Sequence, residues 1–170
     1  IWGEDDDSFL VACGCADGSV SLHAADSGSE GPDAWRTGAP VRSLTFHDSW
    51  LYAGGSNGSL KRRRLSSSSK ESGVFTENSE QALEPNHAGA VVSLCTRDSI
   101  LCSGSQDGSI RIWNLTFPIQ PNVRFGFGGF KVWLGSVNCD ATHLCSDGSD
   151  NTIIMHDFAL ANASLAQLLA

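Results

Sequence analysis

The organisation of the chain is set by one stretch, Ser103-Gly104-Ser105-Gln106-Asp107-Gly108-Ser109-Ile110-Arg111-Ile112-Trp113-Asn114. Two apolar-rich runs, at 100–105 and 110–113, flank the dipeptide Asp107-Gly108. Asp-Gly between such runs is typical of a β-hairpin, because both turn positions favour a positive φ. The stretch is therefore predicted to form a strand, a tight turn and a second strand.

The same pattern recurs along the chain. The turn position is filled by Asp17, Asn57, Asp107 and Asp150, at intervals of 40, 50 and 43 residues. Periods of this length indicate an array of repeats, each of which is one supersecondary unit. Further strands are expected at 9–15, 20–24, 41–46, 50–54, 91–96, 123–127, 132–137, 144–149 and 153–158.

The third repeat carries a family resemblance. It opens with Asn86-His87, has Asp107 in its turn and closes with Trp113-Asn114, while the other copies close with His23-Ala24, Arg63-Arg64 and His156-Asp157. This arrangement resembles the WD-repeat family of β-propellers. The resemblance implies an all-β fold with blades of four antiparallel strands, here as an incomplete propeller. Residues 1–170 are expected to form a single propeller segment, with repeats at about 7–37, 38–85, 86–127 and 128–170 and a flexible loop at about 66–85.

The resemblance also implies a hydrogen-bonded structural tetrad, which consists here of His87, Ser103, Asp107 and Trp113. The first two repeats have Cys13 and Ala53 where this tetrad needs a serine, and the fourth keeps Ser146 but has a histidine in place of the tryptophan. Such a network supports a fold and performs no catalysis. The third repeat is therefore expected to be the most completely formed.

The charge and the apolar content of the chain argue against two classes of protein, those that bind nucleic acid and those that span a membrane. The net charge of −8 and the pI of about 4.9 argue against a nucleic-acid-binding surface. No apolar run approaches the roughly 20 residues needed to cross a bilayer, and no signal segment opens the chain. We expect a soluble protein of the cytoplasm or nucleus without membrane contact. The start at Ile1 and the short first repeat suggest a fragment.

Several side-chain groups could suggest a reactive or metal site. His47-Asp48-Ser49 has the residue types of a nucleophilic triad, but consecutive residues of a tight turn cannot face one another as a triad requires. Cys139, His143 and Cys145 could bind zinc together with Cys13 and Cys15, but their spacing lacks a Cys-x-x-Cys knuckle. Repeat alignment favours cysteines that act as small buried apolar side chains. No catalytic residue, cofactor, metal or small-molecule substrate is expected.

Residues 61–64 form the only strongly basic run, Lys-Arg-Arg-Arg. It could be an import signal or a phosphate-binding patch, or a solvated strand edge protected by charge from pairing with other chains. The run leads into Ser66, which basophilic kinases could phosphorylate. We expect residues 61–69 to be exposed.

The favoured function is a non-catalytic scaffold that binds other proteins through propeller faces. One alternative is the substrate receptor of an F-box ubiquitin ligase, and another is an enzyme site on the propeller. Some WD-repeat proteins recruit cullin ligases through an arginine two places after the closing pair. No arginine occupies that place here, where the residues are Asp26, Ser66, Thr116 and Ala159.

An array cut at both ends leaves two apolar blade faces uncovered. We therefore expect an open arc, in which Val20, Leu22 and the strand at 153–155 are more exposed than Ile110 and Ile112.

Overall fold

The computed structural model describes residues 10–25, 27, 35–65, 80–116, 122–127, 134–147 and 152–157. Within these ranges every regular element is a β-strand and no helix occurs, so none of the described segments could cross a membrane as a helix. The strands form four antiparallel sheets, which we call blades 1 to 4 in chain order.

Each blade is a meander of sequential strands. Blade 1 contains β1 (Leu10–Gly14), β2 (Ser19–Ala24) and β3 (Trp35–Arg36). Blade 2 contains β4 (Val41–His47), β5 (Trp50–Gly55), β6 (Leu60–Arg64) and β7 (Glu80–Leu83). Blade 3 contains β8 (Val91–Arg97), β9 (Ile100–Ser105), β10 (Ile110–Asn114) and β11 (Asn122–Phe127). Blade 4 contains β12 (Val137–Cys139), β13 (His143–Asp147) and β14 (Ile153–Asp157).

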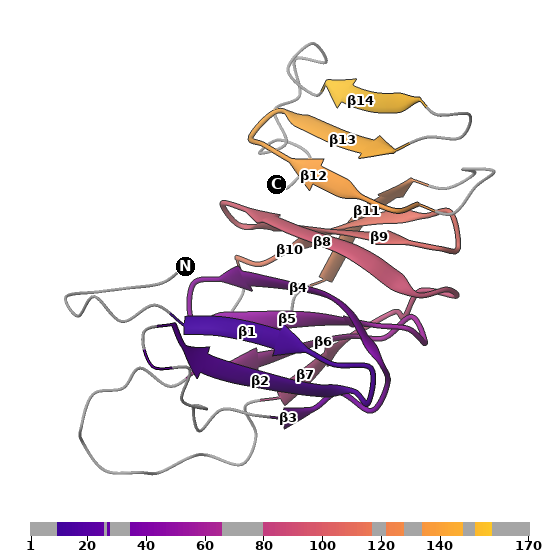
Figure 1. The fold of residues 1–170 in the computed structure, drawn as a ribbon. Coiled ribbons are helices and arrows are strands. Elements are labelled where there is room, and N and C mark those ends of the chain that lie inside the picture. Colours follow the sequence, from indigo (N-terminus) through magenta and orange to yellow (C-terminus); the bar gives the residue numbers. More distant parts are fainter. Residues whose placement is uncertain are drawn as a thin grey trace.

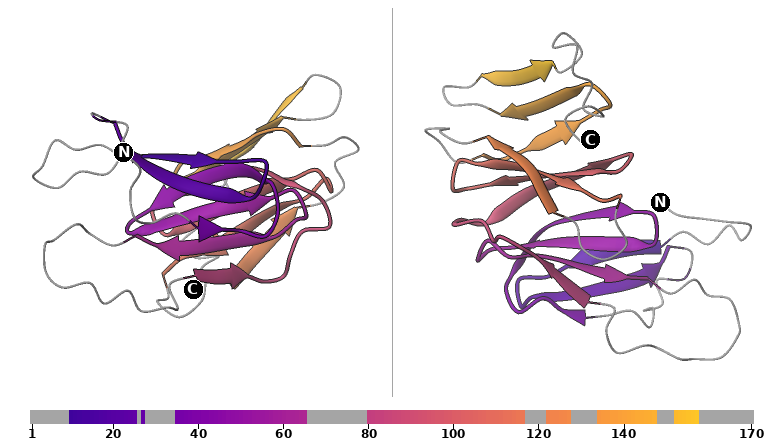
Figure 2. Two further views of the ribbon diagram at one scale, coloured as in Figure 1. Left: turned by 60° about the horizontal axis from the view of Figure 1, so that its bottom comes forward. Right: turned by 180° about the vertical axis from the view of Figure 1, so that it is seen from behind.

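The four blades stack face to face in chain order, from β1–β3 at one end to β12–β14 at the other (Figure 1). Figure 2 shows the same succession from behind, with the two end blades apart. The fold is therefore an incomplete β-propeller, as the family resemblance implied.

The loop between the middle strands of a blade repeats in detail. Gly18, Gly58 and Gly108 have φ angles of 83°, 83° and 75°, a region that glycine enters without steric cost. The side chain before each glycine accepts hydrogen bonds from the backbone N–H and the hydroxyl of the serine that follows, as in Asp107 Oδ1 to Ser109 N at 2.9 Å. The expectation of positive φ at both turn positions is wrong, because this Asx-type bond holds the acidic or amide residue on the negative-φ side.

Neighbouring blades fit together through a repeated contact between a glycine and a valine. A Cβ atom placed on Gly14, Gly54 or Gly104 would lie 2.4, 2.7 or 2.3 Å from a Cγ atom of the first valine in the next inner strand. These valines are Val41, Val91 and Val137. Only glycine permits this approach, which explains why it recurs at this position of the second strand. In blade 4 the position is filled by Asp147, whose carboxylate accepts the N–H groups of Gly135 and Ser136.

Each blade turns one apolar face towards the next blade in the chain, and this direction decides which apolar side chains are covered. Ile110 and Ile112 face blade 4 and are 0% and 2% exposed, whereas their counterparts Ile153 and Met155 are 83% and 62% exposed. The expectation that Val20 and Leu22 would also be exposed is wrong. Both are buried, because they face blade 2 and pack with Trp35, Leu51 and Ala53.

Two predicted boundaries also need correction. The expected flexible loop at 66–85 lies mostly outside the described residues, but its last part forms β7, the outer strand of blade 2. The inner strand of blade 4 was expected at 132–137, yet it begins at Val137 and ends at Cys139. Leu134 is buried although it precedes the strand. A buried apolar residue at this position makes the sequence look like a strand that begins earlier.

Candidate functional site

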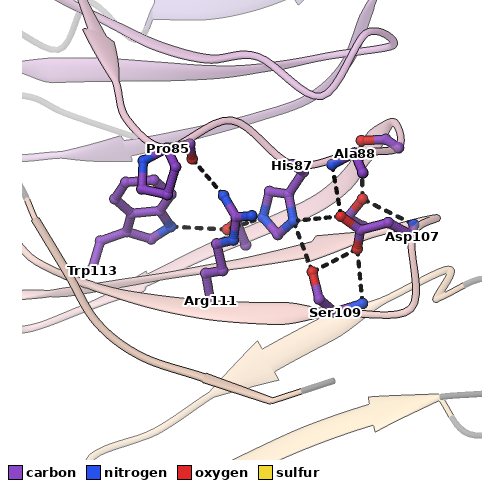
Figure 3. A network of polar contacts seen from close by, with 10 residues as sticks. Pro85, His87, Ala88, Asp107, Ser109, Arg111 and Trp113 are labelled. Carbon is purple, nitrogen blue, oxygen red and sulfur yellow. Dashed lines mark hydrogen bonds and ion pairs between the residues drawn. The ribbon is translucent and has the colours of Figure 1, made fainter. Parts of the chain in front are cut away.

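The most developed polar network lies in blade 3 and joins β9 and β10 to the connection between β7 and β8. His87 lies in that connection and Trp113 lies on β10 (Figure 3), while Ser103 lies on β9. Trp113 Nε1 donates to Ser103 Oγ at 2.9 Å, and Ser103 Oγ lies 2.8 Å from His87 Nε2. His87 Nδ1 lies 3.3 Å from Asp107 Oδ2 and 3.0 Å from Ser109 Oγ. The structure thus brings together the four residues that the sequence placed in one tetrad.

The proton positions follow from chemistry. Because the indole can only donate, the Ser103 hydroxyl hydrogen is free to point at His87 Nε2, which leaves the proton on Nδ1 facing Asp107. Burial, followed by the charge of Arg111, lowers the pKa of His87 and favours this neutral form. Burial raises the pKa of Asp107, but hydrogen bonds from Ser109 and Ala88 outweigh it, so that pKa is lowered overall. The chain of donors therefore runs from the indole to an ionised carboxylate.

This network joins two blades and is closed to ligands. The His87 backbone N–H donates to Gly58 O of blade 2 at 3.0 Å, while its side chain binds blade 3. Arg111 Nη1 donates to Pro85 O in the same connection. The side chain of His87 is 0% exposed, and Ser103 and Trp113 are likewise 0% exposed. A group with no access to solvent cannot meet a substrate, so we propose that the tetrad has a structural role.

The other blades hold partial versions of the network. In blade 2 the serine position is Ala53 and the tryptophan position is Arg63, which lies 5.7 Å from the centre of the Trp35 ring. Thr37 takes the place of His87 and donates to Gly18 O and Ala39 O at 3.1 and 2.8 Å. In blade 4 Ser146 is buried and its Oγ has no hydrogen-bond partner among the described residues. Asp150 lies outside those residues.

A surface hollow opens where the inner strands begin. It encloses about 490 Å³ and is lined by Val41, Arg42, Val92, Gln106, Leu134 and Gly135. Blades 2, 3 and 4 all contribute to it, so its shape depends on the stacking of the blades. Arg42 is exposed and is the charged residue of this lining. The exposed surface of the hollow is mostly polar and includes one cation and one amide.

The basic run at 61–64 lies on β6, and of residues 61–65 only Arg64 is exposed as expected. Arg62 is 2% exposed: its Nε and Nη2 donate to Gln81 Oε1 at 2.9 and 2.6 Å, and its guanidinium lies 4.1 Å from the Trp50 ring centre. Lys61 is half-buried and pairs with Glu80 at 2.6 Å, and Arg64 is exposed. Lys61 and Arg62 differ because successive side chains of a strand point to opposite faces. Arg64 points to the same face as Arg62 but is the last residue of β6 and is exposed. Ser66 lies outside the described residues.

The cysteines are arranged differently from the expectation. Cys13 and Cys15 are exposed, so the prediction that they are buried is wrong. Cys145 and His143 alternate with buried Leu144 on β13 and therefore do not meet Cys139, which pairs with Leu144 in the register. The zinc set considered from the sequence is not assembled.

Cys139 instead meets Cys95 and Cys102, and all three Sγ atoms lie within 4.8 Å of one another. Hydrogen bonds from Cys102 and then Cys95 lower the pKa of Cys139 to about 4. A hydrogen bond with Cys102 lowers the pKa of Cys95, but its bond to Cys139 and its burial outweigh that effect and raise it to about 12. Hydrogen bonding to Cys139 and Cys95 and burial raise the pKa of Cys102.

The residues His47-Asp48-Ser49 form the turn between β4 and β5. Asp48 has a φ of 50° and an 80% exposed side chain, and His47 Nε2 lies 3.4 Å from its Oδ2. Asp98 has a φ of 48° in the matching turn of blade 3. The repeated conformation marks both as turn residues.

Comparison with known proteins agrees with this geometry. The family described as WD domain, G-beta repeat matches residues 79–114, which span β7 to β10. No curated protein sequence matches the chain.

Solved structures share the fold. The computationally designed Ika4 protein has a TM-score of 0.71 at 19% identity, over 92% of this chain and 94% of that one. A chain of the Mitotic Checkpoint Complex has a TM-score of 0.70 at 19% identity, over 89% of this chain and 46% of that one. The WD40 β-propeller domain of Doa1 has a TM-score of 0.67 at 19% identity, over 90% of this chain and 49% of that one. The chain therefore spans about half the length of the last two of these chains, and the likeness concerns the fold alone.

Proposed function

Because residues 79–114 are a WD40 repeat within an incomplete β-propeller, we propose that this chain is a non-catalytic scaffold that binds other proteins. Propellers of this family generally bind proteins through their faces. One neighbour in structure belongs to a multiprotein assembly, the Mitotic Checkpoint Complex. The partners in that assembly are those of the neighbouring structure, and they do not identify a partner of this chain.

The observation that carries the proposal is the hollow of about 490 Å³ at the start of the inner strands. Three blades form its lining, so a bound segment would contact all of them at once. Val41 and Val92 supply apolar contacts, and Arg42 and Gln106 supply a cation and an amide that can fix the orientation of a partner. A peptide with apolar side chains and a nearby carboxylate fits this combination.

The six cysteines are all free thiols in the structure. Free thiols persist in reducing compartments, whereas secreted proteins favour disulfides. We therefore assign the scaffold to the cytoplasm or the nucleus. The net charge of −8 supports a protein partner over a nucleic acid.

Affinity capture with matched charge-reversal variants tests the proposal. Arg42→Glu reverses the charge in the lining of the hollow. Arg97→Glu makes the same substitution outside the hollow, at the last residue of β8, where the side chain is 58% exposed. Proteins captured from a lysate of the source cells are identified by mass spectrometry, purified and titrated against all three forms. We expect Arg42→Glu to weaken binding at least tenfold and Arg97→Glu to leave it unchanged. Equal binding by the three forms would show that the hollow is not the binding site.

A further inference from the structure

Three thiols converge between blades 3 and 4. Cys95 lies on β8 and is the direct cross-strand partner of Cys102 on β9, while Cys139 comes from β12 of the next blade. Cys95 Sγ lies 3.1 Å from Cys139 Sγ, and all three sulfur atoms lie within 4.8 Å of one another. The hairpins β8–β9 and β12–β13, which more than 30 residues of sequence separate, therefore bring three sulfur atoms together.

The backbone around this point is held in place. The Ser93 hydroxyl donates to Val137 O at 3.2 Å and accepts from Val137 N at 2.9 Å, which ties β8 to β12 two residues before Cys95 and Cys139. Val137 also fills the space left by Gly104. Metal sites require ligands positioned by such rigid elements.

Packing alone does not call for sulfur here. At the boundary of blades 2 and 3 the corresponding positions hold Thr45, Tyr52 and Thr96, and the two threonine hydroxyls lie 3.3 Å apart. Since the same interface is built there without a thiol, the repeat does not demand three cysteines.

We propose that Cys95, Cys102 and Cys139 bind one Zn²⁺ ion as three thiolates, with a water molecule as fourth ligand. Tetrahedral zinc with Zn–S bonds of about 2.3 Å places its sulfur ligands about 3.8 Å apart, which side-chain adjustment within this cluster can reach. Cys102 is buried, while Cys95 and Cys139 are half-buried, so the ion and the water have access from one side.

The choice of zinc over copper(I), which also favours thiolates, follows from charge. Three thiolates give a net charge of −1 with Zn²⁺ and −2 with Cu⁺. The cluster packs against the apolar side chains Ile112, Leu134 and Leu144, where a larger unbalanced charge costs more free energy. Bound zinc would also clamp blade 4, which is covered on one face only, to blade 3.

The first test is the zinc content of the whole chain. The chain is reduced with a phosphine, dialysed against Zn²⁺ and analysed for metal and for secondary structure by circular dichroism. We expect one zinc per chain, and folded reduced protein that retains no zinc, or that takes up Cu⁺ but not Zn²⁺, would overturn the proposal.

Two comparisons assign the ligands. Cys95→Ser and Cys139→Ser should each weaken zinc binding at least tenfold, whereas Cys145→Ser, on the opposite face of β13, should leave it unchanged. Should a variant fail to fold, alkylation of the wild-type chain with iodoacetamide decides the question. Zinc should protect the half-buried Cys95 and Cys139, while Cys102 is buried with or without zinc, and the exposed Cys13 and Cys15 should stay reactive. Protection of Cys13 and Cys15, with the cluster still reactive, would overturn the assignment.

Discussion

Removing one hydroxyl from the centre of the blade 3 tetrad should measure what that network contributes. Ser103 is fully buried, accepts the Trp113 indole N–H at 2.9 Å and lies 2.8 Å from His87 Nε2. In Ser103→Ala both groups lose their partner without access to water. Each unsatisfied buried group costs about 1–3 kcal/mol, so we expect the two together to lower the unfolding free energy by about 2–6 kcal/mol.

The matched control is Ser59→Ala in blade 2, which also deletes a serine hydroxyl. Ser59 Oγ donates to Asn57 Oδ1 at 2.7 Å in an exposed turn, where water can replace it. A loss within about 0.5 kcal/mol is expected. Urea denaturation followed by tryptophan fluorescence, at one protein concentration, gives both values. Equal losses in the two variants would refute the view that blade 3 is stabilised by a buried tetrad that blade 2 lacks.

Three further predictions concern pH, phosphorylation and association. The lowered pKa of His87 means that the folded state resists protonation, so stability should fall as pH drops below the ordinary value of 6.5. The lowered pKa of Asp107 should add a second loss below about 3.8, and Asp107→Asn should reduce that loss in urea titrations, while Asp17 and Asp140, whose pKa values are also lowered, retain the rest. An arginine-directed kinase should phosphorylate Ser66, which follows exposed Arg64, and Ser66→Ala should abolish incorporation; a folded chain that incorporates no phosphate would contradict this. The exposed Ile153 should drive self-association in sedimentation experiments, and Ile153→Lys should reduce it; a strictly monomeric wild-type chain would exclude this.

The order of the blades could be predicted because local chemistry repeats along the chain. Asp107-Gly108 and its counterparts fix a loop through one glycine and one side-chain bond, so their spacing reports the period directly. The residues of the tetrad were predicted from the resemblance to the WD-repeat family. The φ angle of the acidic residue did not follow, because Asp-Gly also occurs in two-residue turns in which both residues take positive φ.

What the sequence left open depends on the contacts between blades. Arg62 looked solvated within a basic run, but its burial depends on Gln81 and Trp50, which come from other strands. Val20 and Ile153 occupy equivalent positions in the repeat, and only the presence of a following blade distinguishes their exposure. Which end of the stack leaves its apolar residues uncovered could have been predicted only from the face that each strand presents to the neighbouring blade.

The thiol cluster was missed for a related reason. The hairpin register about Asp98-Ser99 places Cys95 opposite Cys102, and this pairing could have been read from the sequence. Cys139 joins them only because β12 lies against β8, as the bonds between Ser93 and Val137 record. The three cysteines belong to two repeats, so an alignment of single repeats does not show them as a group.

Hydrogen–deuterium exchange of the whole chain, resolved by mass spectrometry, tests the open stack most directly. Blade 3 is covered on both faces, whereas blade 4 leaves Ile153 and Met155 uncovered. Amides of β9 and β10 should therefore exchange most slowly, and those of β13 and β14 much earlier. Equal protection of β13–β14 and β9–β10 in a monomeric sample would mean that the far face of blade 4 is covered, and would contradict an incomplete propeller.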